Sequence, residues 1–222
     1  MASALQAAGH QCLTVPVLAI EELPAPELPA PVLASVTIAI FLSEHAVGPG
    51  LALLARLGSS VQVLAVGPQT ARVLEAAGVV AAAPAQASSE GLLAVPPLAQ
   101  LQGEHVLVCS GEGGRDVLAV GLAQWGAVVT EAPLYRRVPV PVAELAGRVR
   151  PDEVDAIVVS SGDGLRSAAR VWFEVGGTPA VRLFAPSQRV ASIAQTLGFE
   201  RVTVCAGASP QALLEAMTKV MD

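Results

Sequence analysis

Several polar residues stand where apolar segments end, which leaves their side chains free for chemistry. Thr70 follows the apolar segment 61–65 and the break Gly67-Pro68, and it opens a helical pattern that stops at Gly78. The first N–H groups of a helix have no partner within it, and they bind anions or polar ligands. Thr70 is therefore a candidate binding residue. The alternative is an ordinary strand–helix unit that holds no ligand.

A glycine-rich turn, Gly111-Glu112-Gly113-Gly114-Arg115, separates a predicted strand (105–109) from a predicted helix (116–124). It is not a P-loop, because no Lys-Ser/Thr follows, and Asp116 stands where a dinucleotide-binding motif has glycine. The turn either holds an anion through its backbone N–H groups and Arg115 or is a plain tight turn.

Tyr135 is the single tyrosine of the chain, and it lies in a segment that we expect to link two domains. Its phenol is either a hydrogen-bond donor or weak acid at a site, or a packing group at a hinge. Ser161-Gly162 begins another turn at a strand end. No G-x-S-x-G pattern surrounds Ser161, so a serine hydrolase is not indicated.

The residues that position these groups are duplicated. Ser43 and Ser161 stand 118 positions apart, as do Pro68 and Pro186, which places Ser187 in a turn like that before Thr70. A second repeat surrounds the first, with an offset of 117 that pairs Leu5, Gly9 and Pro16 with Leu122, Gly126 and Pro133. Constant offsets over several landmarks predict a duplicated architecture.

Predicted strands alternate with predicted helices along the whole chain, which is typical of parallel sheets covered on both faces. Ligands bind beyond the carboxyl ends of the strands in such folds. Ser43, Thr70, Ser161 and Ser187 all fall at such ends. Two similar domains whose strand ends face each other would form one cleft. We also expect strands over residues 11–19 and 36–41.

The composition excludes several classes of protein. Hydrophobic residues make up 53% and charged residues 14%, which provides an ample core. The net charge of −6 and an aromatic content of 3% argue against nucleic acid as a partner. Three widely spaced cysteines suit a reducing compartment. The histidines lack metal-ligand spacing, and no membrane span or signal peptide is indicated. We expect a cytoplasmic protein without a metal.

The chain resembles the uroporphyrinogen-III synthase family. The resemblance rests on motifs in the family's order and spacing: IFLSEHAV, AVGPQTARVLEAAG, SSEGLL, GEGGR, LYRRV, SSGDGL and GASPQALLEAM. It implies two flavodoxin-like α/β parallel-sheet domains, one inserted into the other and joined by two linkers. The inserted domain would span 24–133, the discontinuous one 1–20 plus 138–222, and the linkers 20–23 and 135–138.

The resemblance also implies an activity: closure of hydroxymethylbilane to uroporphyrinogen III with inversion of the last pyrrole ring, in haem biosynthesis. The family needs no cofactor, and we expect a monomer. Tyr135 falls on the tyrosine that helps the hydroxyl leave. The substrate-binding positions implied are Ser43, Thr70, Arg115, Ser161, Gly162 and Ser187. A non-catalytic two-domain protein that binds a small anion, or an impaired truncated synthase, is the alternative.

The repeat also leaves a gap. In the repeat with offset 117, the first copy lacks a counterpart of residues 104–117, which contain a strand and the glycine-rich turn. We therefore expect the chain to begin partway through a helix, without the first strand of the family. The discontinuous domain should then have the smaller sheet and be the less stable of the two, because strands of a parallel sheet pair on both edges.

Overall fold

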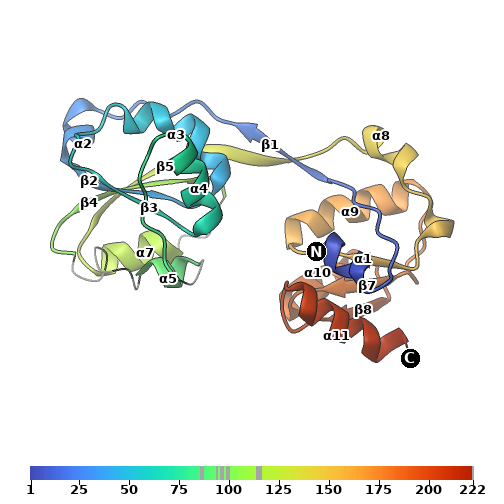
Figure 1. The fold of residues 1–222 in the computed structure, drawn as a ribbon. Helices are drawn as coiled ribbons and strands as arrows, with labels where there is room; N and C mark the ends of the chain where they lie inside the picture. The colour runs from blue at the N-terminus through green and yellow to red at the C-terminus, as the bar shows by residue number, and fades with distance from the viewer. Residues whose placement is uncertain (86–87, 94, 96–97, 99–100, 114–116, 222) are drawn as a thin grey trace. The chain divides into compact units, whose positions relative to one another are not determined.

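The computed structural model describes residues 1–85, 88–93, 95, 98, 101–113 and 117–221. The chain divides into two compact units, and the second is inserted into the first (Figure 1). Unit 1 consists of Met1–Ala19 and Val138–Asp222, and unit 2 of Ile20–Arg137. Each unit is an α/β structure with its own sheet and its own core.

Unit 2 is built on a five-stranded sheet of order β1-β5-β4-β2-β3, in which β2 to β5 are parallel. The strands are β1 (Leu18–Glu22), β2 (Val36–Phe41), β3 (Gln62–Ala65), β4 (His105–Gly111) and β5 (Val128–Pro139). Their connections contain α2 (Ala30–Ser35), the 3₁₀ turn η1 (Glu44–Ala46), α3 (Val47–Leu54), α4 (Pro68–Ala76), α5 (Ser89–Leu93) and α7 (Val117–Gln124). The prediction of residues 36–41 as a strand is confirmed.

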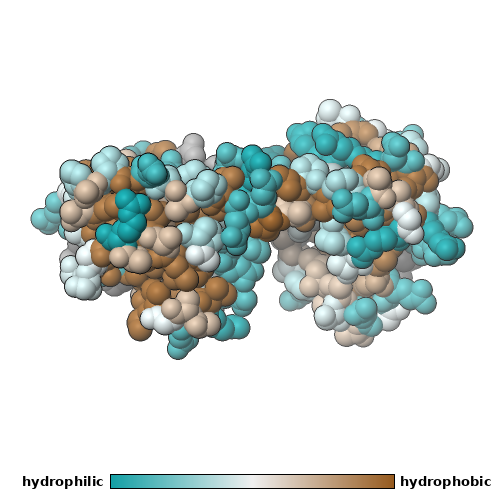
Figure 2. Space-filling model, turned by 90° about the horizontal axis from the view of Figure 1, so that it is seen from above, coloured by the Kyte–Doolittle hydropathy of each residue, from teal (hydrophilic) through white to brown (hydrophobic). Residues whose placement is uncertain are grey.

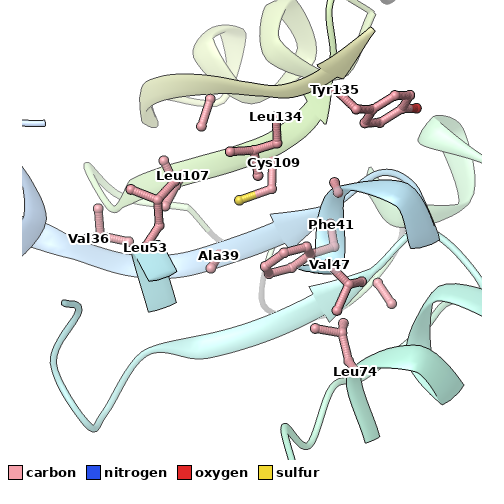
Figure 3. Close-up of a cluster of buried hydrophobic side chains, with 13 residues drawn as sticks. Val36, Ala39, Phe41, Val47, Leu53, Leu74, Leu107, Cys109, Leu134 and Tyr135 are labelled. Atoms are coloured by element: carbon pink, nitrogen blue, oxygen red, sulfur yellow. The ribbon is translucent and has the colours of Figure 1, made fainter. Parts of the chain in front are cut away.

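Side chains of successive residues in β2 enter different cores. Ala39 and Phe41 pack with α3 and α4, in the cluster shown in Figure 3. Ile38 and Ile40 pack on the opposite face with α5 and α7. Figure 1 shows these helix pairs on the two faces of the sheet. The alternation of side chains along a strand explains why this segment is apolar throughout rather than at every second residue.

Gly50 lets α3 lie close to the sheet. A Cβ atom at this position would stand 2.5 Å from Cε1 of Phe41 and 3.1 Å from Cδ1 of Leu134. Glycine at position 50 is therefore needed for space. Helix α3 begins at Val47 and includes the sequence Gly48-Pro49-Gly50 in its first turns.

His105 is a buried structural residue at the amino end of β4. Its Nδ1 lies 2.8 Å from Oγ of Ser35, and its Nε2 lies 2.7 Å from Oγ1 of Thr130. Because the Ser35 hydroxyl donates its proton to the carbonyl oxygen of Val32, it must accept from Nδ1–H. Nε2 then accepts from Thr130. One imidazole thus joins α2, β4 and β5, and both of its nitrogens are occupied.

Unit 1 contains a parallel three-stranded sheet of order β6-β7-β8. The strands are β6 (Ala156–Val158), β7 (Arg182–Ala185) and β8 (Arg201–Val204). The helices are α1 (Ala2–Ala7), α8 (Val142–Leu145), α9 (Gly162–Glu174), α10 (Gln188–Thr196) and α11 (Pro210–Met221), with 3₁₀ turns η2 (Ala146–Arg148) and η3 (Pro151–Glu153). Leu183 packs in one core with α9 and α10, whereas Phe184 packs in another with α1 and α11.

The sheet of unit 1 is smaller, as the gap in the repeat led us to expect. By the repeat, β6 is the counterpart of β2. Strand β2 pairs with β3 on one edge and with β4 on the other. Within the described residues β6 pairs with β7 alone, and Val158 at its end is 36% exposed.

The segments that we expected to link the domains are paired strands. The amide of Leu23 donates to the carbonyl of Leu134 at 2.8 Å, and the amide of Val140 donates to that of Val17 at 3.1 Å. Residue numbers rise along β1 while those of the paired residues fall along β5, so the two strands run antiparallel. The prediction of a strand over 11–19 is wrong. The strand is β1, which begins at Leu18, and residues 10–17 have no regular structure. Residues 79–83 contribute only the bridge between Leu64 and Ala82.

Both polar and apolar residues reach the surface of each unit (Figure 2). The exposed apolar side chains include Val80 and Trp125 in unit 2 and Val204 in unit 1. Single exposed apolar residues are usual in folded proteins. No described helix combines the length and the hydropathy that crossing a bilayer would require.

Candidate active site

Two predicted residues of unit 2 lie at neighbouring strand ends. Phe41 of β2 pairs with Ala65 of β3, so the turns that follow lie at the same edge of the sheet. Ser43 caps η1, and its Oγ accepts from the amide of His45 at 3.3 Å. Thr70 lies in the first turn of α4 and is 4% exposed. The sheet thus brings the starts of η1 and α4 together.

A side-chain hydrogen bond joins these two turns directly. Nε2 of Gln69 donates to Oε2 of Glu44 at 3.0 Å. Helix α4 also packs against η1. A carboxylate already lies at this position, and it engages the side-chain amide of Gln69.

A β-bulge orients Tyr135. Ser110 of β4 pairs with Pro133 of β5, but the next residue, Gly111, pairs with Tyr135. The extra residue is Leu134. In a regular strand Leu134 and Tyr135 would point to opposite faces, whereas both contribute to the same buried cluster (Figure 3). The bulge therefore directs the phenol ring to the face that carries α3 and α4.

Three neighbours hold the Tyr135 ring, which is 3% exposed. Nη2 of Arg137 lies 3.2 Å from the phenol oxygen, and Cζ of Arg137 lies 5.5 Å from the ring centroid. The ring of His45 lies 5.6 Å away in an edge-on arrangement. Gly111 lies under the end of the ring, where a Cβ atom would stand 2.5 Å from Cζ of Tyr135.

The direction of the hydrogen bond at the phenol matters chemically. A guanidinium has donors and no acceptor, so Arg137 donates and the Tyr135 oxygen accepts. The phenol keeps its own proton for another acceptor. Since Arg137 is an exposed residue, the hydroxyl end of this buried ring meets an exposed cation. The arrangement suits a weak acid held in one orientation.

Unit 1 repeats the arrangement of serine caps. Oγ of Ser161 accepts from the amide of Gly164 at 3.1 Å at the start of α9. Oγ of Ser187 accepts from the amide of Val190 at 3.4 Å at the start of α10. The preceding strands, β6 and β7, are adjacent and parallel, so both helix starts lie at one sheet edge. Each capping oxygen accepts one N–H and leaves its hydroxyl proton for a ligand.

Gly162 is buried, and it lies beside an arginine that was not among the predicted site residues. A Cβ atom on Gly162 would stand 3.1 Å from Cδ1 of Ile193 and 3.5 Å from Nη1 of Arg189. Arg189 therefore brings a cation to the start of α9, where the backbone already favours anions. Its position two residues after Ser187 was the signal in the sequence that could have identified it.

The predicted residues fall into two groups, one in each unit. Ser43, Thr70 and Tyr135 belong to unit 2, and Ser161, Gly162 and Ser187 to unit 1. Arg115 lies outside the described residues. Arg137 and His45 were not among the predicted site residues. Arg137 stands two positions after Tyr135 along a strand, which places both on one face, but recognising this required knowing that the segment is a strand.

Among the described residues, no group of three or more His, Cys, Asp or Glu side chains could hold a metal ion. Burial raises the pKa of the Cys109 thiol from 9.0 to about 12, which keeps this cysteine protonated and unreactive in the core.

Comparison with known proteins identifies the family. The family model described as uroporphyrinogen-III synthase HemD matches residues 1–215. The chain is 33% identical over 231 residues to the uroporphyrinogen-III synthase of Salmonella typhimurium, covering 98% of this chain and 94% of that protein. The chain belongs to the uroporphyrinogen-III synthase family. The Escherichia coli uroporphyrinogen-III synthase is 34% identical over 134 residues, which cover 58% of this chain and 54% of that protein.

Solved structures show the same fold. The uroporphyrinogen-III synthetase of Helicobacter pylori matches with a TM-score of 0.63 at 16% identity, covering 92% of this chain and 91% of its own. A mutant uroporphyrinogen III synthase of Thermus thermophilus matches with a TM-score of 0.52 at 20% identity, covering 99% and 93%. The two-domain α/β fold expected from the sequence for a uroporphyrinogen-III synthase is therefore confirmed.

Proposed function

We propose that this protein closes hydroxymethylbilane to uroporphyrinogen III, with inversion of the last pyrrole ring, in haem biosynthesis. The observation that carries the proposal is membership of the uroporphyrinogen-III synthase family over residues 1–215. The Tyr135 phenol, with its oxygen accepting from Arg137 and its proton free, supports an acid role in the first step. The proposed substrate is a small molecule that carries many carboxylates.

The reaction begins when the hydroxymethyl C–O bond breaks. Tyr135 gives its proton to the departing hydroxyl, which leaves as water, and the adjacent pyrrole nitrogen supplies electrons to the carbon left behind. The α-carbon of the last pyrrole ring that already carries a methylene bridge attacks that carbon and forms a spiro intermediate. The older bridge bond then breaks, and its methylene carbon bonds to the free α-carbon of the same ring, which inverts the ring. The proton released when the final ring regains aromaticity restores the phenol. Substrate therefore becomes product plus one water.

Most of the task is to hold the substrate in the geometry that leads to inversion. Unassisted hydroxymethylbilane closes without inversion, so the protein has to favour one geometry over another, which is catalysis by positioning. A net charge of −6 opposes binding of a polyanion, and local donors must overcome it. We assign this task to Ser43 and Thr70 in unit 2, to Ser161, Gly162 and Ser187 in unit 1, and to Arg115.

The ratio of product isomers tests the proposal. Purified protein is mixed with hydroxymethylbilane, the products are oxidised to porphyrins, and the isomers are separated by chromatography. We expect isomer III in excess at protein concentrations far below that of substrate. A protein that only binds the substrate would leave isomer I as the product.

We further propose that the protein acts as a monomer in the cytoplasm. Support for the location comes from its three unpaired cysteines, Cys12, Cys109 and Cys205, which suit a reducing compartment. Sedimentation at several protein concentrations tests the monomer, and fractionation of cells tests the location.

A further inference from the structure

We infer that Arg137 is a positioning residue for the Tyr135 phenol, and that it acts on catalysis through the tyrosine rather than by binding substrate. The inference rests on the proposed function, because it assigns a partner to the acid of that reaction. Its observations are the hydrogen bond of 3.2 Å, the 5.5 Å between Cζ of Arg137 and the ring centroid of Tyr135, and the two-residue spacing along β5 that places both side chains on one face.

The backbone around Tyr135 is arranged to hold the ring in one place. The amide of Glu112 donates to the carbonyl of Tyr135 at 2.7 Å, directly after the pairing of Gly111 with Tyr135. Gly111 does not have a positive φ, so its missing side chain provides space rather than conformational freedom. That space is filled by the phenol, whose Cζ, Cε2 and oxygen would lie 2.5, 2.8 and 2.9 Å from an added Cβ.

The ring is fixed by these contacts, but the hydroxyl proton can still rotate about the C–O bond. A donor to the oxygen restricts this rotation, because the oxygen's lone pair then faces the donor and its proton faces away. Arg137 provides that donor. His45 contacts the aromatic ring and cannot replace it, since the 5.6 Å between centroids describes an edge-on ring contact.

The neighbouring arginine provides a matched comparison. Arg136 is also exposed, but it forms an ion pair with Glu21, with Nη2 and Oε1 2.6 Å apart. Arg136 comes directly after Tyr135 in the sequence, but its side chain binds the paired strand β1 instead of the phenol. If loss of positive charge near the site were what mattered, substituting either arginine would lower activity. If the hydrogen bond to the phenol is what matters, only substitution of Arg137 would lower it.

The experiment is a double-mutant cycle measured as isomer-III formation. The variants are Arg137→Gln, Arg137→Lys, Tyr135→Phe, Tyr135→Phe/Arg137→Gln and the control Arg136→Gln. We expect Arg137→Gln to lower kcat roughly tenfold with little change in KM, since a hydrogen bond from a charged donor is removed. Arg137→Lys should recover part of the loss. Arg136→Gln should retain wild-type kcat and KM.

The Tyr135→Phe background decides the question. If Arg137 acts through the phenol oxygen, removing that oxygen removes its effect, and the double variant should match Tyr135→Phe alone. A further tenfold loss in that background would overturn the inference. So would a raised KM with unchanged kcat, because it would make Arg137 a substrate-binding residue. A wild-type protein that yields only isomer I would instead refute the proposed function.

Discussion

Tyr135 is the residue on which the proposed chemistry depends. Tyr135→Phe removes the acid and leaves the ring contacts with Gly111 and His45 in place. Isomer-III formation should therefore slow by roughly 10² to 10⁴, the usual contribution of a general acid. The free energy of unfolding should change by about 1 kcal/mol or less, because the lost partner, Arg137, is exposed to water. Isomer analysis and urea unfolding measure the two effects, and an unchanged rate would remove Tyr135 from the mechanism.

Cys109 makes a prediction about alkaline pH. In the folded protein the pKa of its thiol is about 12, above the ordinary value of 9.0, so the unfolded chain loses this proton first. Its contribution to stability is complete below pH 9 and is lost progressively as the pH rises from about 9 to 12. At pH 10 the loss is about 1 kcal/mol. Urea unfolding of wild type and Cys109→Ala at pH 8 and 10 measures it, and equal losses in both proteins would contradict the assignment.

The bulge of β5 is the decisive local element of the site. Gly111→Ala places a Cβ atom where the phenol lies, so either the ring or strand β4 must shift. We expect kcat for isomer III to fall at least tenfold, since small displacements of a reacting group cost that much. Gly113→Ala is a poor control because Gly113 has a φ of +69°. Gly147→Ala, with no atom within 4 Å of the added Cβ, is the better one. Wild-type kcat in Gly111→Ala would show that the space is not needed.

The elements show what the sequence can predict and what it cannot. Strand β2 and the start of α4 follow from local patterns, an apolar run and the Gly67-Pro68 break, and these were predicted correctly. The pairing of β1 with β5 depends on residues more than a hundred positions apart, and the local pattern placed the strand at 11–19 instead. The bulge at Leu134 is set by the register with β4, which periodicity does not reveal.

The candidate site shows the same limit. The helix-start residues Ser43, Ser161 and Ser187 were placed by the repeat, because duplicated turns have duplicated positions. Arg137 and Arg189 were missed, since their relevance comes from what they approach: the phenol in one case and the start of α9 in the other. Contacts made by long side chains depend on the assembled fold.

At the scale of the whole molecule, the two units should differ in stability. Strand β6 pairs on one edge, while its counterpart β2 pairs on both. We therefore expect the central strand β7 of unit 1 to be less protected from hydrogen exchange than β2 and β4 of unit 2, by tenfold or more. The slowest amides of each sheet report its opening free energy. Hydrogen exchange measured by mass spectrometry tests this. Equal protection in the two sheets would mean that the unpaired edge of β6 does not lower the stability of unit 1.

Fluorescence gives an independent measure of the same difference. The chain has two tryptophans: Trp172, buried in unit 1, and Trp125, 43% exposed in unit 2. In a Trp125→Phe variant the emission of Trp172 reports unit 1 alone. The emission of Trp172 should shift at a lower urea concentration than the one at which the amides of β2 and β4 lose their protection from hydrogen exchange.

The order in which the chain is made follows from the insertion of unit 2. Leu5 of α1 packs against Phe184 of β7, which is synthesised 179 residues later. At about 5 to 20 residues per second, the first helix waits roughly 10 to 35 seconds on the ribosome for its partner. Unit 2 is one continuous stretch and can fold during that interval. The helix of unit 1 that emerges first is therefore among the last parts of the molecule to be buried, and Leu5 is open to chaperones throughout the wait.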